Sequence, residues 1–299
     1  MIQTSFVRLN RRLVAVEGTN SYGAGITRTL TMANVPVVEA RPPKWASRAG
    51  RGKSDVIDAE AAARSVLGKD TSMLIWPRAG KLRSALRVLL TARRSMNSQR
   101  TADRNALTAL VRTIDIGIDA RRPLTDTQVA LVAGWCIRPS DDVEQATARA
   151  VATRLARNVL TLSDRLEENM ASLQRHVQEL TPPLMDAPGV GPVTAAVFIT
   201  VYSHPGRVRS EAALAGAAPI PASSGNTVRY RFSRHGDRQL NSAFEIVARA
   251  RLAFDPNTRA YHQRRLAEGK TPREIRRLLK RYIARQIYRQ LNTAMTATP

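Results

Sequence analysis

The sequence predicts a mainly α-helical protein with a small α/β region at its N-terminal end. Two short runs rich in β-branched residues, 13–19 and 35–40, predict strands, and a helical pattern lies between them. From about residue 80 to residue 180, apolar residues recur at helical spacing. A small region punctuated by glycine and proline follows, and it ends in a very basic helical segment.

Residues 13–68 alternate between predicted strands and helices. The strand LVAVEGT precedes the helix YGAGITRTLTMAN, and the strand VPVVEA precedes the helix SDVIDAEAAARSVLG, after a loop rich in arginine, proline and glycine. Because a helix follows a strand twice, we expect the two strands to pair in parallel, with a right-handed crossover.

The second region contains a long amphipathic helix. Its apolar residues recur every three or four positions, with charged residues between them: Val151, Leu155, Val159, Leu162, Leu166, Met170, Leu173, Val177 and Leu180. Two partners for this apolar face are possible. One is a coiled coil that joins chains into a homo-oligomer, a dimer or tetramer, and the other is a neighbouring helix of the same chain.

The stretch TPPLMDAPGVGP interrupts the helical pattern and predicts a domain boundary. Beyond it we expect a small α-helical domain that ends in the basic helix TPREIRRLLKRYIARQIYRQL. The expected domains are therefore residues 1–75, 76–182 and 183–299.

The net charge of the chain indicates a polyanionic partner. Lys and Arg number 47 against 24 Asp and Glu, which gives a formal net charge of +23. Release of counterions from phosphates favours nucleic acid as the partner, with an anionic membrane surface as the second choice. The chain has no apolar run of about 18 residues and no signal-peptide pattern at its start, so we expect a soluble, cytoplasmic protein.

The cysteine and histidine content argues against disulfides and structural zinc. Cys136 is the single cysteine, and the four histidines are scattered, so neither an internal disulfide nor a zinc-binding pattern is available. We expect Cys136 to be a small buried apolar residue.

Three carboxylates predict a magnesium site. If Ser54 caps the helix that follows it, Asp55 lies in the first turn and Asp58 lies on the same face one turn later. Glu17 ends the first strand, so its carboxylate lies at the carboxyl edge of the sheet, where open α/β sheets hold their ligands. Magnesium prefers carboxylate oxygens. The alternative for the aspartate pair is helix capping and solvation.

Four motifs in a fixed order carry a family resemblance. VEGTNSYG, RGKSDVIDAEAAA, PGVGPVTAAVF and LAGAAPIPASSGNTVRYRFSRHGDRQLNSAF resemble the transposases of the insertion-sequence-110 family, and the resemblance runs from about residue 13 to residue 290. It implies a site-specific DNA recombinase. Its parts would be an N-terminal RuvC-like (RNase H-like) DEDD nuclease domain, a coiled-coil connector and a C-terminal transposase domain.

The resemblance also implies roles for individual residues. Glu17 matches the glutamate of the family's magnesium-binding Asp-Glu-Asp-Asp tetrad, and Asp55 and Asp58 match its closing pair. In the motif PIPASSG, Ser224 matches the family's nucleophilic serine, with Ser223 as the second choice. A turn residue in a Ser-Gly pair is the alternative for Ser224. A structured guide RNA and an active site shared between subunits are further implications of the resemblance.

One part of the family pattern has no match. Only sixteen residues precede Glu17 and none is acidic, so the first aspartate of the tetrad and the opening strands of a RuvC-like sheet are missing. We therefore expect a chain truncated at its N-terminus, either by a late gene start or by decay of the element. The alternative function is an inactive remnant that binds nucleic acid.

The C-terminal region contains the residues predicted to contact nucleic acid. Gly189 and Gly191 have the spacing of a helix-hairpin-helix turn, whose backbone N–H groups can hold a phosphate, and an ordinary tight turn is the alternative. The predicted basic contacts are Arg229, Arg231, Arg234, Arg238, Arg276, Arg277, Lys280 and Arg281, within a wider set that includes Arg273 and Arg285.

Overall fold

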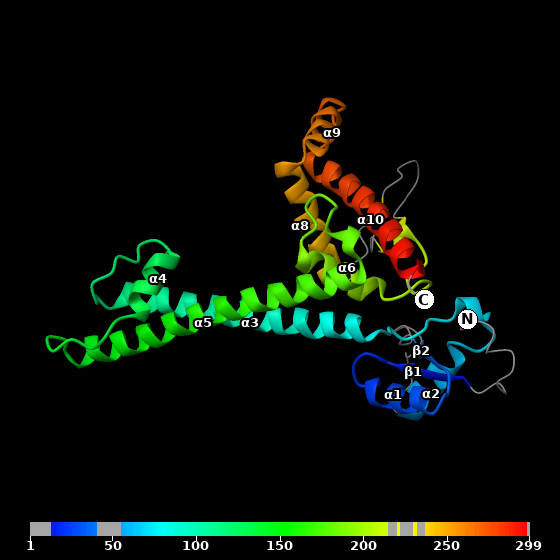
Figure 1. The fold of residues 1–299 in the computed structure, drawn as a ribbon, viewed down its shortest axis with the longest axis horizontal. Helices are drawn as coiled ribbons and strands as arrows, with labels where there is room; N and C mark the ends of the chain where they lie inside the picture. Colours follow the sequence, from blue (N-terminus) through cyan, green and yellow to red (C-terminus); the bar gives the residue numbers. More distant parts are fainter. Residues whose placement is uncertain (1–12, 41–54, 215–219, 222–229, 232–236, 298–299) are drawn as a thin grey trace. The chain divides into compact units, whose positions relative to one another are not determined.

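The computed structural model describes residues 13–40, 55–214, 220–221, 230–231 and 237–297 (Figure 1). The chain divides into two compact units. The first combines residues 1–80 with 203–209, and the second combines residues 81–202 with 210–299. Both contain helices, and the chain is mainly helical, as the sequence predicts.

The first unit contains the predicted alternation of strands and helices. Its elements are β1 (Val14–Glu17), α1 (Ala24–Met32), β2 (Val37–Ala40) and α2 (Asp55–Arg64). The strands pair in parallel, with Val14 opposite Val37 and Glu17 opposite Ala40, which confirms the expected pairing. Val38 is fully buried, so β2 contributes to the apolar core of this unit.

The outer edge of β2 is covered by a segment that the sequence did not indicate. The backbone N–H of Glu39 donates to the carbonyl of Ile75 at 2.7 Å, just after the short helix η3 (Thr71–Met73). Residues 203–209 lie in the same unit although they are far away in the sequence. Two distant stretches of chain therefore complete the small sheet region.

Two long helices form the scaffold of the second unit. α3 (Lys81–Thr113) and α5 (Val143–Leu180) lie side by side and run antiparallel (Figure 1). Asn169 donates to the Leu89 carbonyl at 3.1 Å, and Arg100 donates to Ser163 at 3.4 Å. Residue numbers in α5 therefore fall as those in α3 rise, as expected for antiparallel helices. The apolar face of α5 thus packs on a neighbour in the same chain, and association between chains remains a proposal.

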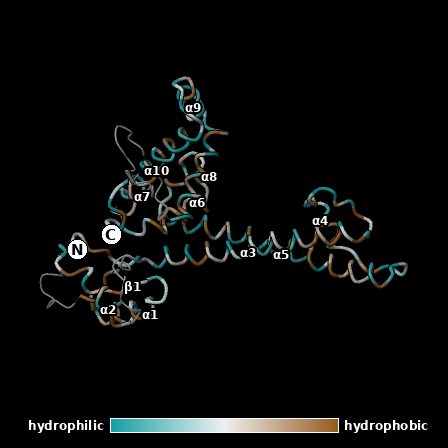
Figure 2. The backbone as a smooth tube through the Cα atoms, turned by 180° about the vertical axis from the view of Figure 1, so that it is seen from behind, coloured by the Kyte–Doolittle hydropathy of each residue, from teal (hydrophilic) through white to brown (hydrophobic). Residues whose placement is uncertain are grey.

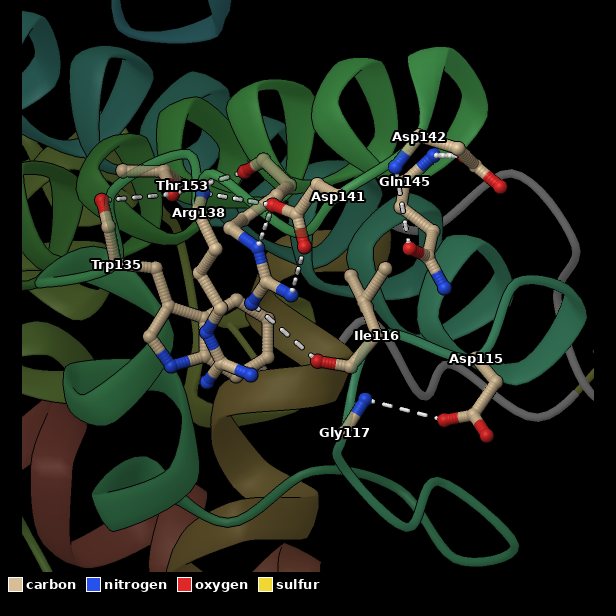
Figure 3. A network of polar contacts seen from close by, with 10 residues as sticks. Asp115, Ile116, Gly117, Trp135, Arg138, Asp141, Asp142, Gln145 and Thr153 are labelled. Carbon is tan, nitrogen blue, oxygen red and sulfur yellow. Dashed lines mark hydrogen bonds and ion pairs between the residues drawn. The ribbon is translucent and has the colours of Figure 1, made fainter.

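The end of the α3–α5 pair carries a small compact cap that contains α4 (Asp126–Ala133). Figure 3 shows its polar network. Arg149 donates to both carboxylate oxygens of Asp141, at 2.7 and 3.0 Å, and both side chains are almost completely buried. These hydrogen bonds and one from the Arg138 backbone hold the pKa of Asp141 below its usual range. The guanidinium of Arg149 also lies over the Trp135 ring.

The expectation that Cys136 is buried is wrong. Cys136 is exposed, in the segment that follows α4. The neighbouring Trp135 packs its indole against the apolar core of the cap, and Cys136 does not contribute to this core.

Among its described residues, the C-terminal part of the second unit is helical and contains a short β pair. Its elements are α6 (Pro192–Tyr202), α7 (Glu211–Leu214), β3 (Ile220–Pro221), β4 (Tyr230–Arg231), α8 (Arg238–Phe254), α9 (Pro256–Ala267) and α10 (Pro272–Ala297). β3 and β4 pair antiparallel. α10 buries Ile275, Ile283 and Ile287. Figure 2 shows hydrophobic and hydrophilic residues alternating along this unit's long helices, the pattern of elements with one buried face.

The compact units do not follow the three expected domains. The expected boundary near residue 75 lies close to Gly80, where the first unit ends. At residues 182–183 the chain turns through η4 (Pro182–Leu184), but α6 then packs against both α3 and α5. The connector helices and the start of the C-terminal region therefore pack against each other within one compact unit. None of the described helices combines the length and the hydropathy needed to span a bilayer.

Candidate functional site

The predicted metal-binding carboxylates lie on two contacting elements. Glu17 is the last residue of β1, at the carboxyl end of the parallel pair, and it is exposed. Asp58 lies on α2, which packs against β1, and it is partly exposed. Asp55 begins α2, but its side chain and the predicted cap Ser54 lie outside the described residues. Within the described ranges, no three His, Cys, Asp or Glu side chains gather closely enough to hold a metal.

The turn after Glu17 depends on two glycines. Gly18 has a φ of 62°, which favours glycine, and its carbonyl accepts from the backbone N–H groups of Ser21 at 2.7 Å and Gly23 at 3.0 Å. A Cβ on Gly23 would lie 2.4 Å from the Glu17 carbonyl oxygen. The motif VEGTNSYG therefore forms a tight turn that begins directly at the candidate metal ligand.

Glu39 is a carboxylate at this edge that the sequence analysis did not single out. Its Oε2 accepts from the Thr19 hydroxyl at 3.0 Å, and its Oε1 accepts from Arg207 at 3.0 Å. Partial burial raises the pKa of Glu39, but the hydrogen bonds and charge of Arg207, helped by Thr19, lower it overall. Each carboxylate oxygen of Glu39 is therefore hydrogen-bonded within the protein. The sequence feature that could have identified Glu39 is its position as the acidic residue in the otherwise apolar strand VVEA.

The predicted nucleophile falls outside the described residues. Ser224 and Ser223 belong to the segment between β3 and β4. Pro221 and Tyr230, on either side of this segment, are paired in the antiparallel β3–β4 ladder.

The two glycines of the predicted helix-hairpin-helix turn have different surroundings. Gly189 has a φ of 75°, and a Cβ there would lie 3.0 Å from both the Ala250 Cβ and the Val247 carbonyl oxygen of α8. Close packing on α8 thus accounts for Gly189 without any ligand. The N–H of Gly191 donates to the Thr194 hydroxyl at 3.0 Å, and no atom lies within 4 Å of a Cβ placed on Gly191.

Several of the predicted basic contacts are engaged within the protein. Lys280 and Arg276 pair with Glu245 at 2.6 and 3.4 Å, and the hydrogen bond from Lys280 is the main reason that the pKa of Glu245 is lowered. Arg285 and Arg289 both pair with Glu211 of α7, at 2.8 and 3.2 Å. Arg238 is exposed at the start of α8. The side chains of Arg229, Arg231 and Arg234 lie outside the described residues.

Three other arginines form a stripe on α10. Arg273, Arg277 and Arg281 are exposed, stand four residues apart, and make no ion pair or hydrogen bond with the described part of the chain. We call them the α10 arginine stripe. Side chains at this spacing are neighbours on one helix face, and like charges there destabilise a helix by about 0.2–0.5 kcal/mol per pair. A row of phosphates would relieve this repulsion.

Comparison with known proteins identifies two matching regions. A model described as "Transposase", of the DEDD type, matches residues 5–115, and a model described as "Transposase IS116/IS110/IS902 family" matches residues 182–263. The first region contains the three candidate carboxylates and the second contains Ser223 and Ser224.

Two curated relatives are proteins of insertion elements. The chain is 38% identical over 105 residues to an uncharacterized 43.6 kDa protein of insertion element IS110 from Streptomyces coelicolor, a match to 34% of this chain and 25% of that protein. It is 28% identical over 204 residues to an uncharacterized 42 kDa protein of insertion element IS900 from Mycobacterium paratuberculosis, a match to 64% of this chain and 48% of that protein. The chain thus spans about half or less of the relatives that it matches.

Substitution of the two glycines should separate packing from ligand contact. Gly189→Ala should lower the free energy of unfolding by about 1–3 kcal/mol, because alanine at positive φ is strained and its methyl group presses on α8. Gly191→Ala, the matched control, should be close to neutral, because its methyl group points into open space. Urea denaturation measures both. A neutral Gly189→Ala would contradict the packing role.

The α10 arginine stripe should contribute more to nucleic-acid binding than its ion-paired neighbours do. The triple change of Arg273, Arg277 and Arg281 to Gln should reduce the slope of log affinity against log salt by about 2 to 3 on duplex DNA. A second triple variant removes the same charge from the same helix by changing Arg276, Arg285 and Arg289 to Gln, and it should change the slope much less. Fluorescence anisotropy over a salt series makes the comparison. Equal slopes for the two variants would contradict this assignment.

Proposed function

We propose that the chain is a recombinase of the IS116/IS110/IS902 group of insertion-sequence transposases, which cuts and rejoins DNA by serine attack, because two transposase family models match it. The observation that supports this most is the order of the two matched regions. The carboxylates Glu17, Asp55 and Asp58 fall in the first, and the serine motif with Ser224 falls in the second. In this proposal the carboxylates and the serine are the two chemical components of the reaction, and each lies in one of the matched regions.

The proposed step is attack by the Ser224 hydroxyl on a DNA phosphodiester. A bond forms between Oγ and phosphorus, the bond from phosphorus to the leaving deoxyribose oxygen breaks, and the serine proton ends on that oxygen. One phosphodiester is exchanged for another. The released hydroxyl of a different strand can then attack the phosphorus of the serine linkage: a new bond forms between that oxygen and phosphorus, the bond from phosphorus to Oγ breaks, and the proton of the attacking hydroxyl returns to Ser224. One phosphodiester again replaces another, so the DNA backbone is restored without an external energy source.

The carboxylates are proposed to hold a divalent metal, and magnesium is our choice because all three are hard oxygen ligands. When bound, the metal would neutralise charge at the scissile phosphate. Glu17 and Asp58 lie on contacting elements, which supports this assignment. The described residues do not assemble three ligands, so the role of Asp55 rests on its position in the sequence.

The proposed partners are DNA and a structured guide RNA, and the proposed assembly is a homo-oligomer formed through α3 and α5, with an active site shared between subunits. The net charge of +23 and the α10 arginine stripe support polyanion binding. A cytoplasmic location is part of the same proposal.

A second candidate function is nucleic-acid binding without cleavage. The observation that favours it is the contrast between the two surfaces in the described residues. The three arginines of the stripe are exposed on one helix face, whereas of the three candidate metal ligands only the side chains of Glu17 and Asp58 lie among the described residues. A binding-only protein would retain the salt-dependent affinity and would exchange no strands.

Ser224→Ala tests the proposed function. This variant should reduce strand exchange in magnesium by about 10³-fold or more, because it removes the attacking atom. Its affinity for DNA should be nearly that of the parent chain, since one hydroxyl adds little to so many arginines. Gel analysis of cleaved and joined products measures exchange, and anisotropy measures binding.

Ser223→Ala is the matched control, with the same chemical change one residue earlier, and it should retain most of the activity. If Ser223→Ala lost strand exchange and Ser224→Ala retained it, the nucleophile would be Ser223. A parent chain that binds DNA tightly but exchanges no strands would support the binding-only function.

A further inference from the structure

Residues 203–209 lie in the first compact unit although both neighbouring stretches of chain belong to the second. Ser203 Oγ accepts from the backbone N–H of Ala79 at 3.3 Å, and His204 Nε2 contacts the Pro77 carbonyl at 3.3 Å. Arg209 donates to the Met73 carbonyl. Ser203 is buried with a φ of 67°, unusual for a residue with a side chain, so its surroundings must hold it in this conformation.

Arg207 forms the central contact of this segment. One guanidinium nitrogen donates to the Trp76 carbonyl at 2.9 Å, and another donates to Glu39 at 3.0 Å. The Arg207 side chain is 9% exposed and that of Glu39 is 23% exposed. Such a charge-assisted contact, shielded from water, is stronger than a surface ion pair and fixes the direction of both side chains.

The contacts continue from Glu39 to the turn that follows Glu17. The second carboxylate oxygen of Glu39 accepts from Thr19, a buried residue two positions after Glu17. In the ladder, Glu39 lies opposite Val16, directly beside the end of β1. A chain of side-chain contacts therefore runs from Arg207 through Glu39 and Thr19 to the turn at Gly18–Gly23.

We propose that Arg207 is a positioning residue that fixes the turn after Glu17 through Glu39 and Thr19. Its functional meaning rests on the proposed function, because Glu17 is a candidate metal ligand only in that reaction. A segment from the region matched by the second family model thus holds the site of the first. Arg207 itself contacts neither DNA nor metal in this role.

Hydrogen exchange on the complete 299-residue chain tests the proposal without any catalytic activity. The backbone N–H groups of Ser21 and Gly23, both bonded to the Gly18 carbonyl, report on the turn. In Arg207→Ala and in Thr19→Val they should exchange about ten- to a hundredfold faster, the range expected for loss of a hydrogen bond to a charged group. Thr19→Ser retains the hydroxyl and should retain the protection.

Arg209→Ala is the matched control, because it removes an arginine from the same segment without touching Glu39. It should leave the exchange of Ser21 and Gly23 unchanged. Unchanged exchange in either Arg207→Ala or Thr19→Val would overturn the proposal, and so would equal acceleration in Arg209→Ala. If Arg207→Ala loosens the whole unit, Thr19→Val decides: acceleration confined to the turn supports the proposal, and its absence overturns it.

A second measurement separates this proposal from the proposed function. If the parent chain exchanges strands, Arg207→Ala should reduce the rate at least about tenfold while DNA affinity is retained, and Arg209→Ala should not reduce it. Activity unaffected by Arg207→Ala would overturn the positioning role and leave the serine mechanism intact. An inactive parent chain would refute the proposed function, and the hydrogen-exchange result would still decide the role of Arg207.

Discussion

In the described part of the first unit, the small parallel sheet of β1 and β2 has hydrogen-bond partners outside these two strands, and the rest of the unit is arranged around them. A two-stranded sheet has little stability of its own, and the backbone groups at its edges need partners. In this unit the outer edge of β2 is bonded to Ile75, and the carbonyls of the irregular segment around Ile75 accept from residues 203–209. The position of the turn after Glu17 therefore depends on chain from the other half of the sequence.

The second unit follows from a different constraint, the burial of long apolar helix faces. α3 and α5 bury one face against each other, and α6 packs on both, so the proline and glycine stretch bends the chain without separating α6 from the two long helices. Buried polar groups, such as Asn169 bonded to the Leu89 carbonyl, hold the two helices in register. The face of α10 that is not buried is basic. Some of its arginines form ion pairs, and the others form the arginine stripe.

Local patterns predicted the elements well, because periodicity reflects which face of an element is buried. The strands around Val14 and Val37, their parallel pairing and the long helix α5 all follow from such patterns. Contacts between distant stretches could not be predicted in this way. No local signal links Arg207 to Glu39, and the exposure of Cys136 depends on which neighbour packs inward. The site residues came from the family resemblance, and a role for Ser224 remains a prediction.

The central claim is that a serine of this chain becomes covalently joined to DNA. The most direct test is to incubate the parent chain with DNA and magnesium, isolate any protein–DNA adduct, digest both components and identify the modified peptide by mass spectrometry. The account predicts a nucleotide attached to Ser224. A nucleotide on any other residue, or strand exchange that proceeds without a covalent adduct, would contradict it.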